Sequence, residues 1–149
     1  MKITVRAHEN PYRDPAAKPT RAQFIRLGGD SVSIRLQELR RRLGAINGVV
    51  EEIHYTGEDT GWATRYRVDE STLCTVRVLP GELEARFDAD PGVAAKILHA
   101  KSVGAEVKKG VQAALDCDPP GRVLVRLGNA TAVRSFGNAI LIKSKSSLP

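Results

Sequence analysis

The segment Trp62–Arg67, WATRYR, concentrates side chains that are suited to binding a ligand. Trp62 and Tyr66 could form an apolar wall against which a flat molecule stacks. Arg65 and Arg67 could hold a carboxylate or a phosphate, because a guanidinium presents paired donors in a fork. A strand over this segment would place the two rings on one face and the two guanidinium groups on the other. One site could therefore use all four residues only by wrapping around the edge of the strand.

Each of these groups also has a purely structural interpretation. The two rings could pack in a core, and arginines on strands often pair with carboxylates on neighbouring strands. Arg77 is expected to pair with Glu84 in this way. Arg65 and Arg67, in contrast, are expected to face uncharged residues on the next strand, which leaves them available to an anion.

No reaction signature occurs in the chain. The glycines form neither a G-x-G-x-x-G motif nor a phosphate-binding P-loop, and no serine lies in a G-x-S-x-G turn. Cys74 is expected in the core, and Cys117 lies between two aspartates, which disfavour a thiolate. An enzyme of unknown reaction is an alternative, and it would require a perturbed pKa at His54 or Cys74 beside a cleft. No cofactor is expected.

Charge is unevenly distributed along the chain. Its 23 Lys and Arg residues and 17 Asp and Glu residues give a net charge of +6. Residues 1–48 carry 10 basic and 4 acidic side chains, residues 49–90 carry 4 and 10, and residues 91–149 carry 9 and 3. Two basic flanks thus bracket an acidic centre. This pattern suits attraction within the fold as well as it suits a nucleic acid partner.

Nucleic acid and metal are two further ligand classes that this charge could serve. Nucleic acid binding would require Arg35 and Arg40–Arg42 to share a surface with Lys108 and Lys109, and we do not expect it, because no aromatic residue is interleaved with these arginines. Iron or another hard cation would require the acidic centre to gather its carboxylates. Their spacing matches no metal-binding motif, so no metal site is expected. These carboxylates are Glu51, Glu52, Glu58, Asp59, Asp69 and Glu70.

Hydrophobic periodicity predicts an α+β fold in the order ααββββααβα. Apolar residues recur at helical spacing in the second predicted helix, whereas residues 49–88 alternate with period two, as strands do. The predicted helices span 20–27, 31–46, 91–100 and 102–116, with a last helix from residue 130. The predicted strands span 49–55, 62–68, 72–79 and 82–88, with a short fifth strand at 122–127.

The first four strands are expected to form an antiparallel meander. A turn at Asp69–Ser71 places Tyr66 opposite Cys74, and a turn at Pro80–Gly81 continues the same alternation into the next strand. Both turns bring the same apolar residues to one face, so the helices are expected to pack on that face in a two-layer fold. The expected core face comprises Trp62, Thr64, Tyr66, Cys74, Val76, Val78, Leu83, Ala85 and Phe87.

Length and composition are typical of one globular domain, with 149 residues of which 42% are hydrophobic. Residues 1–19 are predicted to be a proline-rich arm, 20–145 a single α+β domain and 146–149 a frayed tail. Two cysteines without a C-x-x-C pair favour a reducing compartment. The chain has no long apolar run, so we expect neither a signal peptide nor a membrane-spanning segment. A cytoplasmic location is therefore expected. The oligomeric state is open.

The stretch Gly61–Phe87 resembles the core signature of a bacterial family catalogued as domain of unknown function 3788. The family pattern is a G-W-A-x-R-Y-R strand followed by a short turn and T-L-C-T, and it corresponds here to Gly61–Arg67 and Thr72–Thr75. The predicted helices before the four strands, and the helix–strand–helix segment after them, also fit the layout of that family, so the resemblance covers residues 20–145. It implies a compact two-layer α+β domain, similar in shape to small frataxin-like iron-chaperone proteins. No established activity, and hence no catalytic residue, comes with it.

These observations favour a non-enzymatic accessory domain that binds a small molecule or a protein partner. The candidate ligand-binding residues are Trp62, Arg65, Tyr66 and Arg67. No motif identifies the partner or selects one face of the sheet.

Overall fold

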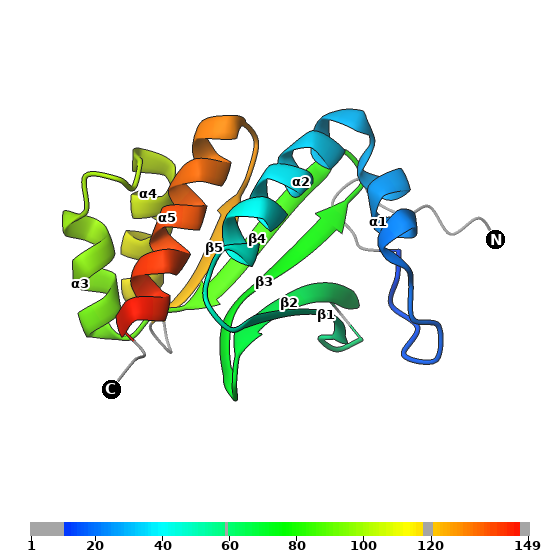
Figure 1. Cartoon of the computed structure of the whole chain (residues 1–149), viewed down its shortest axis with the longest axis horizontal. Helices are drawn as coiled ribbons and strands as arrows, with labels where there is room; N and C mark the ends of the chain where they lie inside the picture. The colour runs from blue at the N-terminus through cyan, green and yellow to red at the C-terminus, as the bar shows by residue number, and fades with distance from the viewer. Residues whose placement is uncertain (1–10, 59, 118–120, 147–149) are drawn as a thin grey trace.

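Five helices and five strands make up most of the part of the chain that the structure describes, residues 11–58, 60–117 and 121–146 (Figure 1). The structure is a computed structural model. Its elements follow the predicted order ααββββααβα, which confirms the α+β class. In chain order they are α1 (Arg21–Gly28), α2 (Asp30–Gly44), β1 (Val49–Tyr55), β2 (Trp62–Val68), β3 (Ser71–Leu79), β4 (Glu82–Asp88), α3 (Pro91–His99), α4 (Ala105–Leu115), β5 (Arg122–Arg126) and α5 (Ala130–Ser146).

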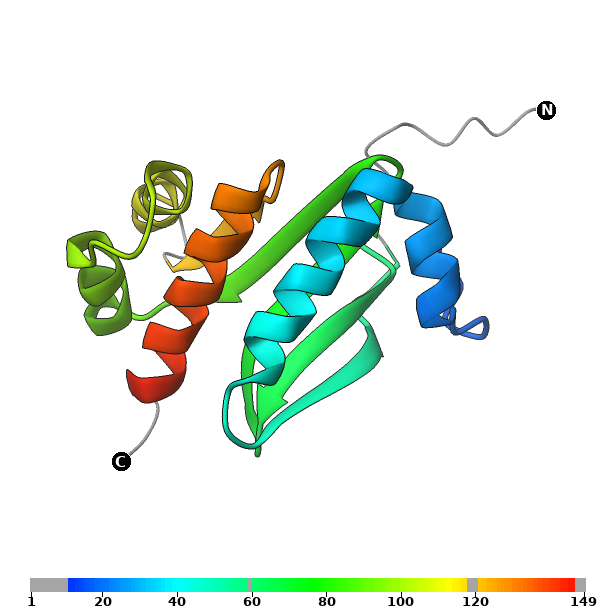
Figure 2. The ribbon, with the colours of Figure 1, turned by 45° about the horizontal axis from the view of Figure 1, so that its top comes forward.

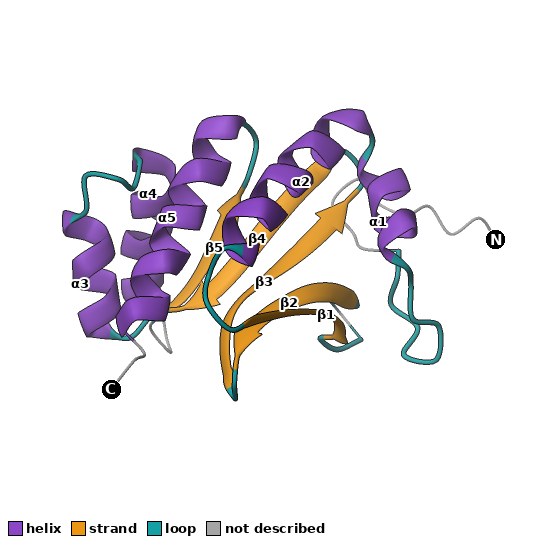
Figure 3. Cartoon of the chain, in the orientation of Figure 1, coloured by secondary structure: helices purple, strands orange, loops and turns teal. Residues whose placement is uncertain are grey.

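The strands form one sheet in the order β1-β2-β3-β4-β5, and every neighbouring pair is antiparallel. Helices α2 and α5 lie side by side across the sheet, with α1 next to α2 and with α3 and α4 next to α5 (Figures 2 and 3). The fold therefore has two layers with the helices on one face, as predicted. We call the face that carries Tyr66 and Val76 the helix face, and the face that carries Arg65 and Arg77 the open face.

The β2–β3 hairpin follows the predicted register with one correction. Tyr66 pairs with Cys74 as expected, but a bulge after Tyr66 shifts the register so that Val68 pairs with Ser71. Asp69 has a φ of 52°, a left-handed conformation that Asp adopts more readily than most residues. The turn can therefore close over two residues, Asp69 and Glu70, one residue shorter than expected.

The core lies between the helix face and helices α2 and α5. Phe136 of α5 is fully buried, and its ring meets that of Phe87 of β4 edge-on, with centroids 5.8 Å apart. Of the predicted core face, Trp62 and Thr64 are only partly buried, and the other residues are buried as predicted. Helix α2 adds an apolar stripe at helical spacing: Val32, Leu36, Leu39 and Leu43.

Capping residues fix where two of the helices begin. The Thr20 hydroxyl accepts a hydrogen bond from the Gln23 amide at 3.2 Å, and the Gln23 side chain accepts one from the Thr20 amide at 2.7 Å. This capping box starts α1. Asp90 accepts from the Val93 amide at 2.8 Å, and Pro91 fills the first helical position of α3. The chain therefore turns away from the sheet directly after β4.

Parts of the predicted arm and tail lie outside the described residues, namely 1–10 and 147–149, as does Asp59. Residues 12–14 of the arm contact the ends of β1 and β2. Within the described part of the chain, no helix combines the length and the apolarity that crossing a membrane requires.

Candidate functional site

Trp62 and Tyr66 lie on the helix face, and each side chain donates a hydrogen bond to another residue of the protein. Tyr66 is 1% exposed, and its hydroxyl donates to Glu51 Oε2 at 2.7 Å. Trp62 Nε1 donates to the carbonyl oxygen of Asp14 at 2.7 Å, and the Trp62 ring lies 5.3 Å from that of Tyr55. Tyr66 thus belongs to the core, and Trp62 contacts the arm.

Arg65 and Arg67 lie on the open face, where both reach the carboxylate of Glu52. Their Nε atoms donate to Glu52 Oε1 at 2.7 and 3.1 Å. The expectation that these arginines lack a counter-charge is wrong, because it considered neighbours on β3, whereas Glu52 comes from β1 and pairs with Arg65 in the β1–β2 register. The four residues predicted to bind a ligand are thus divided between the two faces. Their role in binding stays a prediction.

Glu51 and Glu52 are adjacent but point to opposite faces of the sheet. Glu51 accepts from Tyr66 and from Arg40 Nε at 3.0 Å, and it also pairs with Arg21. Burial alone would raise the pKa of the Glu51 carboxyl, but the hydrogen bonds from Arg40 and Tyr66 lower it below its usual value. Within the described residues, no three His, Cys, Asp or Glu side chains gather as metal ligands would.

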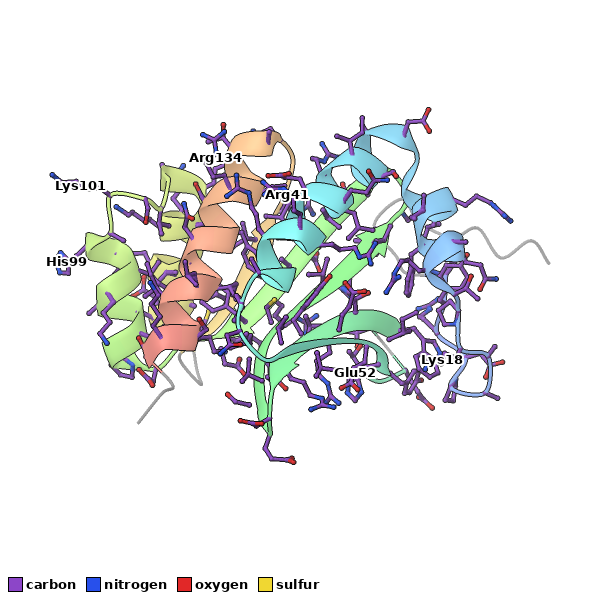
Figure 4. All side chains as sticks on the ribbon, in the orientation of Figure 1. Lys18, Arg41, Glu52, His99, Lys101 and Arg134 are labelled. Carbon is purple, nitrogen blue, oxygen red and sulfur yellow. The ribbon has the colours of Figure 1, made fainter. Side chains whose placement is uncertain are left out.

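The arginines of α2 donate hydrogen bonds to other residues of the protein. Helix α5 lies between α2, which carries these arginines, and α4, which carries Lys108 and Lys109 (Figure 2). Arg41 lies among the helices and Glu52 lies at the strands, in separate regions of the molecule (Figure 4). The geometry therefore gives nucleic acid binding no support. The bonds join Arg35 to the Gly128 carbonyl, Arg40 to Glu51, and Arg41 and Arg42 to Glu38.

His54 and Cys74 were the two groups that an enzyme would have to activate. Cys74 is buried on β3, and this burial raises the pKa of its thiol far above neutrality. Burial and the charge of Arg65 lower the pKa of His54, although Glu52 opposes them. Both groups are therefore uncharged at neutral pH, and Cys74 is not a thiolate nucleophile.

A cavity of about 100 Å³ opens where β3 and β4 separate. Thr75 of β3 pairs with Arg86 of β4, and beyond this pair β3 follows β2 while β4 follows β5. Lys143 reaches this gap from the last turns of α5. We call it the fork cavity, and it is lined by Thr72, Leu73, Cys74, Thr75, Arg86, Phe87, Asp88, Arg122 and Lys143.

Arg86 is half-buried in the fork cavity, and it makes no hydrogen bond or ion pair with any residue that the structure describes. Burial lowers the pKa of its guanidinium and the like charge of Arg77 lowers it further, whereas the carboxylates of Glu84 and Asp88 oppose this shift without reversing it. The nearby glutamates of β4 are engaged elsewhere: Glu84 accepts from Arg77 Nε at 2.9 Å, and Glu82 pairs with Arg126 at 3.7 Å. Because this guanidinium loses part of its hydration without gaining a hydrogen bond from the described residues, an anion in the cavity would stabilise it.

Lys143 and Arg122 bring two more cations to the fork cavity. Lys143 Nζ lies 5.9 Å from the centroid of the Phe87 ring. Burial lowers the pKa of its ammonium, whereas the carboxylate of Asp88 raises it. Arg122 is 71% exposed and lies 4.0 Å from Asp88. The cavity thus combines three cations, one carboxylate and two threonine hydroxyls.

A larger cavity, of about 190 Å³, lies between the N-termini of α4 and α5. Two of its polar side chains accept hydrogen bonds from backbone amides of the lining. Ser135 Oγ accepts from the Gly104 amide at 2.9 Å, and Asn129 Oδ1 accepts from the Ala132 amide at 2.8 Å. The fork cavity is therefore the better candidate for a functional site.

Sequence reasoning did not single out the fork cavity. It expected the arginines of the strands to pair with carboxylates on neighbouring strands and did not consider Lys143. The available signal was the register itself, which sets Arg86 opposite the uncharged Thr75. The contribution of α5 could not be read from the sequence, because it depends on how the last helix crosses the sheet.

No protein-family model, no curated protein and no solved structure matches this chain. The resemblance of Gly61–Phe87 to domain of unknown function 3788 therefore stays a prediction.

Proposed function

We propose that this chain is a non-enzymatic binding domain that holds a small molecule by an anionic group in the fork cavity. The observation that carries the proposal is Arg86, a half-buried cation without a hydrogen bond or an ion pair among the described residues. An anion in the cavity would form an ion pair with this cation and could accept two hydrogen bonds from the guanidinium. Lys143 and Arg122 would add positive charge around it.

The volume of the fork cavity limits which part of a ligand can enter. Its volume is about 100 Å³. A cavity needs only about 10–15 Å³ to hold one water, so the fork cavity has room for a phosphate, sulfate or carboxylate group. The remainder of a larger ligand would extend from the opening. The proposed ligand class is thus a small molecule that carries a phosphate or a carboxylate.

Binding is favoured over catalysis by the chemistry of the lining. The thiol of Cys74 is protonated at neutral pH, and the cations are suited to holding an anion in place. Both cysteines are free thiols, which supports our proposal that the protein works in the reducing cytoplasm.

Inorganic phosphate is expected to raise the melting temperature of the wild-type protein, and Arg86→Gln is expected to abolish this shift. Phosphate at about 100 times its dissociation constant would stabilise the fold by about 2.7 kcal/mol. Without phosphate, Arg86→Gln should be at least as stable as the wild type, because the substitution removes a half-buried charge that forms no ion pair with the described residues. Thermal-shift titrations of both proteins measure the two effects.

Lys145→Gln provides the matched control, because Lys145 is an exposed lysine on the same helix as Lys143. This variant should keep the full phosphate shift, whereas Lys143→Gln should lose most of it. Phosphate also stabilises proteins by being excluded from their surface, an effect common to all variants. An equal shift in the wild type, Arg86→Gln and Lys145→Gln would therefore contradict a site in the fork cavity.

A further inference from the structure

Three consecutive carbonyl groups of the N-terminal arm are held at the end of the sheet. The Trp62 amide donates to the carbonyl of Tyr12 at 2.8 Å, and Trp62 Nε1 donates to that of Asp14 at 2.7 Å. The Tyr55 hydroxyl donates to the carbonyl of Arg13 at 3.0 Å. All three donors belong to the framework of the sheet, whereas all three acceptors are backbone atoms that any sequence would provide.

Side chains of the arm add selectivity to this backbone recognition. The Tyr12 ring meets that of Phe24 in α1 edge-on, with centroids 5.6 Å apart and planes at 87°. The Tyr12 hydroxyl donates to the carbonyl of Gln23 at 3.4 Å. Two residues later the chain turns, because the amides of Ala16 and Ala17 donate to the side chain and the carbonyl of Asp14 at 2.9 and 3.1 Å. The segment of the arm that contacts the domain is thus an aromatic residue, Tyr12, followed two residues later by a turn that begins with Asp14 and Pro15.

The residues that contact the arm come from three elements of the domain. Tyr55 and Trp62 are a cross-strand pair of β1 and β2 with rings 5.3 Å apart, and Phe24 of α1 contacts the ring of Tyr12. We call these three residues the aromatic shelf. Aromatic side chains that donate hydrogen bonds, set on a rigid sheet, are a recurring means of binding short proline-containing segments.

We propose that the aromatic shelf is a peptide-recognition site that the arm occupies in cis. Its partner in trans would be a segment with an aromatic residue in the place of Tyr12, followed by an Asp-Pro turn. The arm itself shows the contacts that such a segment would make. Because the arm is tethered, its effective concentration is on the order of millimolar, and a partner would bind appreciably only after the arm is weakened. This site is separate from the fork cavity.

The test uses the full chain with the arm weakened by Tyr12→Ala, and the probe is a capped synthetic peptide of residues 11–18. Trp62 is the only tryptophan, so its emission reports occupation of the shelf directly. Tyr12→Ala should change this emission, and the peptide should restore it with saturation. The wild type should need at least about tenfold more peptide for any response. A peptide with alanine in place of tyrosine should not restore the emission.

Two further variants keep the test informative if Tyr12→Ala does not fold. Asp14→Ala weakens the turn at an exposed residue, so it should also expose the shelf and respond to the peptide. Adding Tyr55→Phe removes the donor to Arg13 and should weaken peptide binding about fivefold to tenfold. The proposal is overturned if the peptide leaves the emission of both weakened variants unchanged, or if the alanine peptide works equally well. It is also overturned if the wild type without peptide is a dimer whose dissociation on dilution changes the Trp62 emission, since the occupant would then be the arm of a second copy.

Discussion

Phe136→Ala is expected to lower the free energy of unfolding by about 3–5 kcal/mol. Phe136 is fully buried where α5 crosses the sheet, and its ring packs against Phe87 of β4. Alanine would leave a cavity there, and the neighbouring side chains could fill it only in part, because both helices and strands constrain them. Urea unfolding followed by far-ultraviolet circular dichroism measures the loss.

Leu141→Ala is the control for this substitution, because Leu141 lies on the same helix and is 39% exposed. It should change the free energy of unfolding by no more than about 1 kcal/mol. The Phe136 variant should also bind phosphate more weakly, because Phe136 holds in place the helix that carries Lys143. Equal effects of the two substitutions on stability would contradict the position of α5 described above.

Glu51→Ala is expected to cost about 2–3 kcal/mol, the second largest effect. The Glu51 carboxylate joins Tyr66 of β2 to Arg40 of α2 and Arg21 of α1. Its removal leaves the buried Tyr66 hydroxyl without its acceptor and Arg40 without its counter-charge. Tyr66→Phe, which removes the buried donor as well, should recover part of this loss in the double variant, and a double-mutant cycle measures the recovery.

The contribution of Glu51 should also depend on pH. The folded-state pKa of its carboxyl lies below the usual value of 4.5, so the stabilisation is complete above that pH. It is lost as the pH falls through the folded-state pKa, because the carboxyl then binds a proton in both states. The stability difference between the wild type and Glu51→Gln should therefore shrink on acidification below about pH 4.5. Glu70→Gln, at an exposed residue of the β2–β3 turn, is the control, and a difference independent of pH would contradict the network.

The strands and their faces could be predicted because two independent signals agree. Period-two alternation places Tyr66, Cys74 and Val76 on one face, and the turns predicted at Asp69–Ser71 and Pro80–Gly81 gave the same pairing of Tyr66 with Cys74 and of Val76 with Ala85 that the sheet has. A register error of one residue would have inverted every side chain, so the agreement was informative. The bulge after Tyr66 was not predictable, because it moves the pairing of only the last residues of the hairpin.

The partners of charged residues could not be predicted in the same way. The connection between the 49–55 and 62–68 strands has six residues, more than the usual tight turns, so it gave no prediction of their register. That register decides that Glu52 neutralises Arg65 and Arg67. The fork cavity and the arm depend on packing between segments distant in sequence, and local patterns carry no information about such contacts.

The most direct test of the central claim is a phosphate titration of the isotopically labelled protein, followed by the side-chain Nε–H signals of arginine in NMR spectra. We predict saturable shifts for Arg86 and for the amide signals of Thr75 and Asp88, with little change at Arg65, Arg67 and the Trp62 indole. Sulfate should compete at the same signals. An Arg86 signal that does not move while those of Arg65 and Arg67 do would contradict the fork cavity as the binding site.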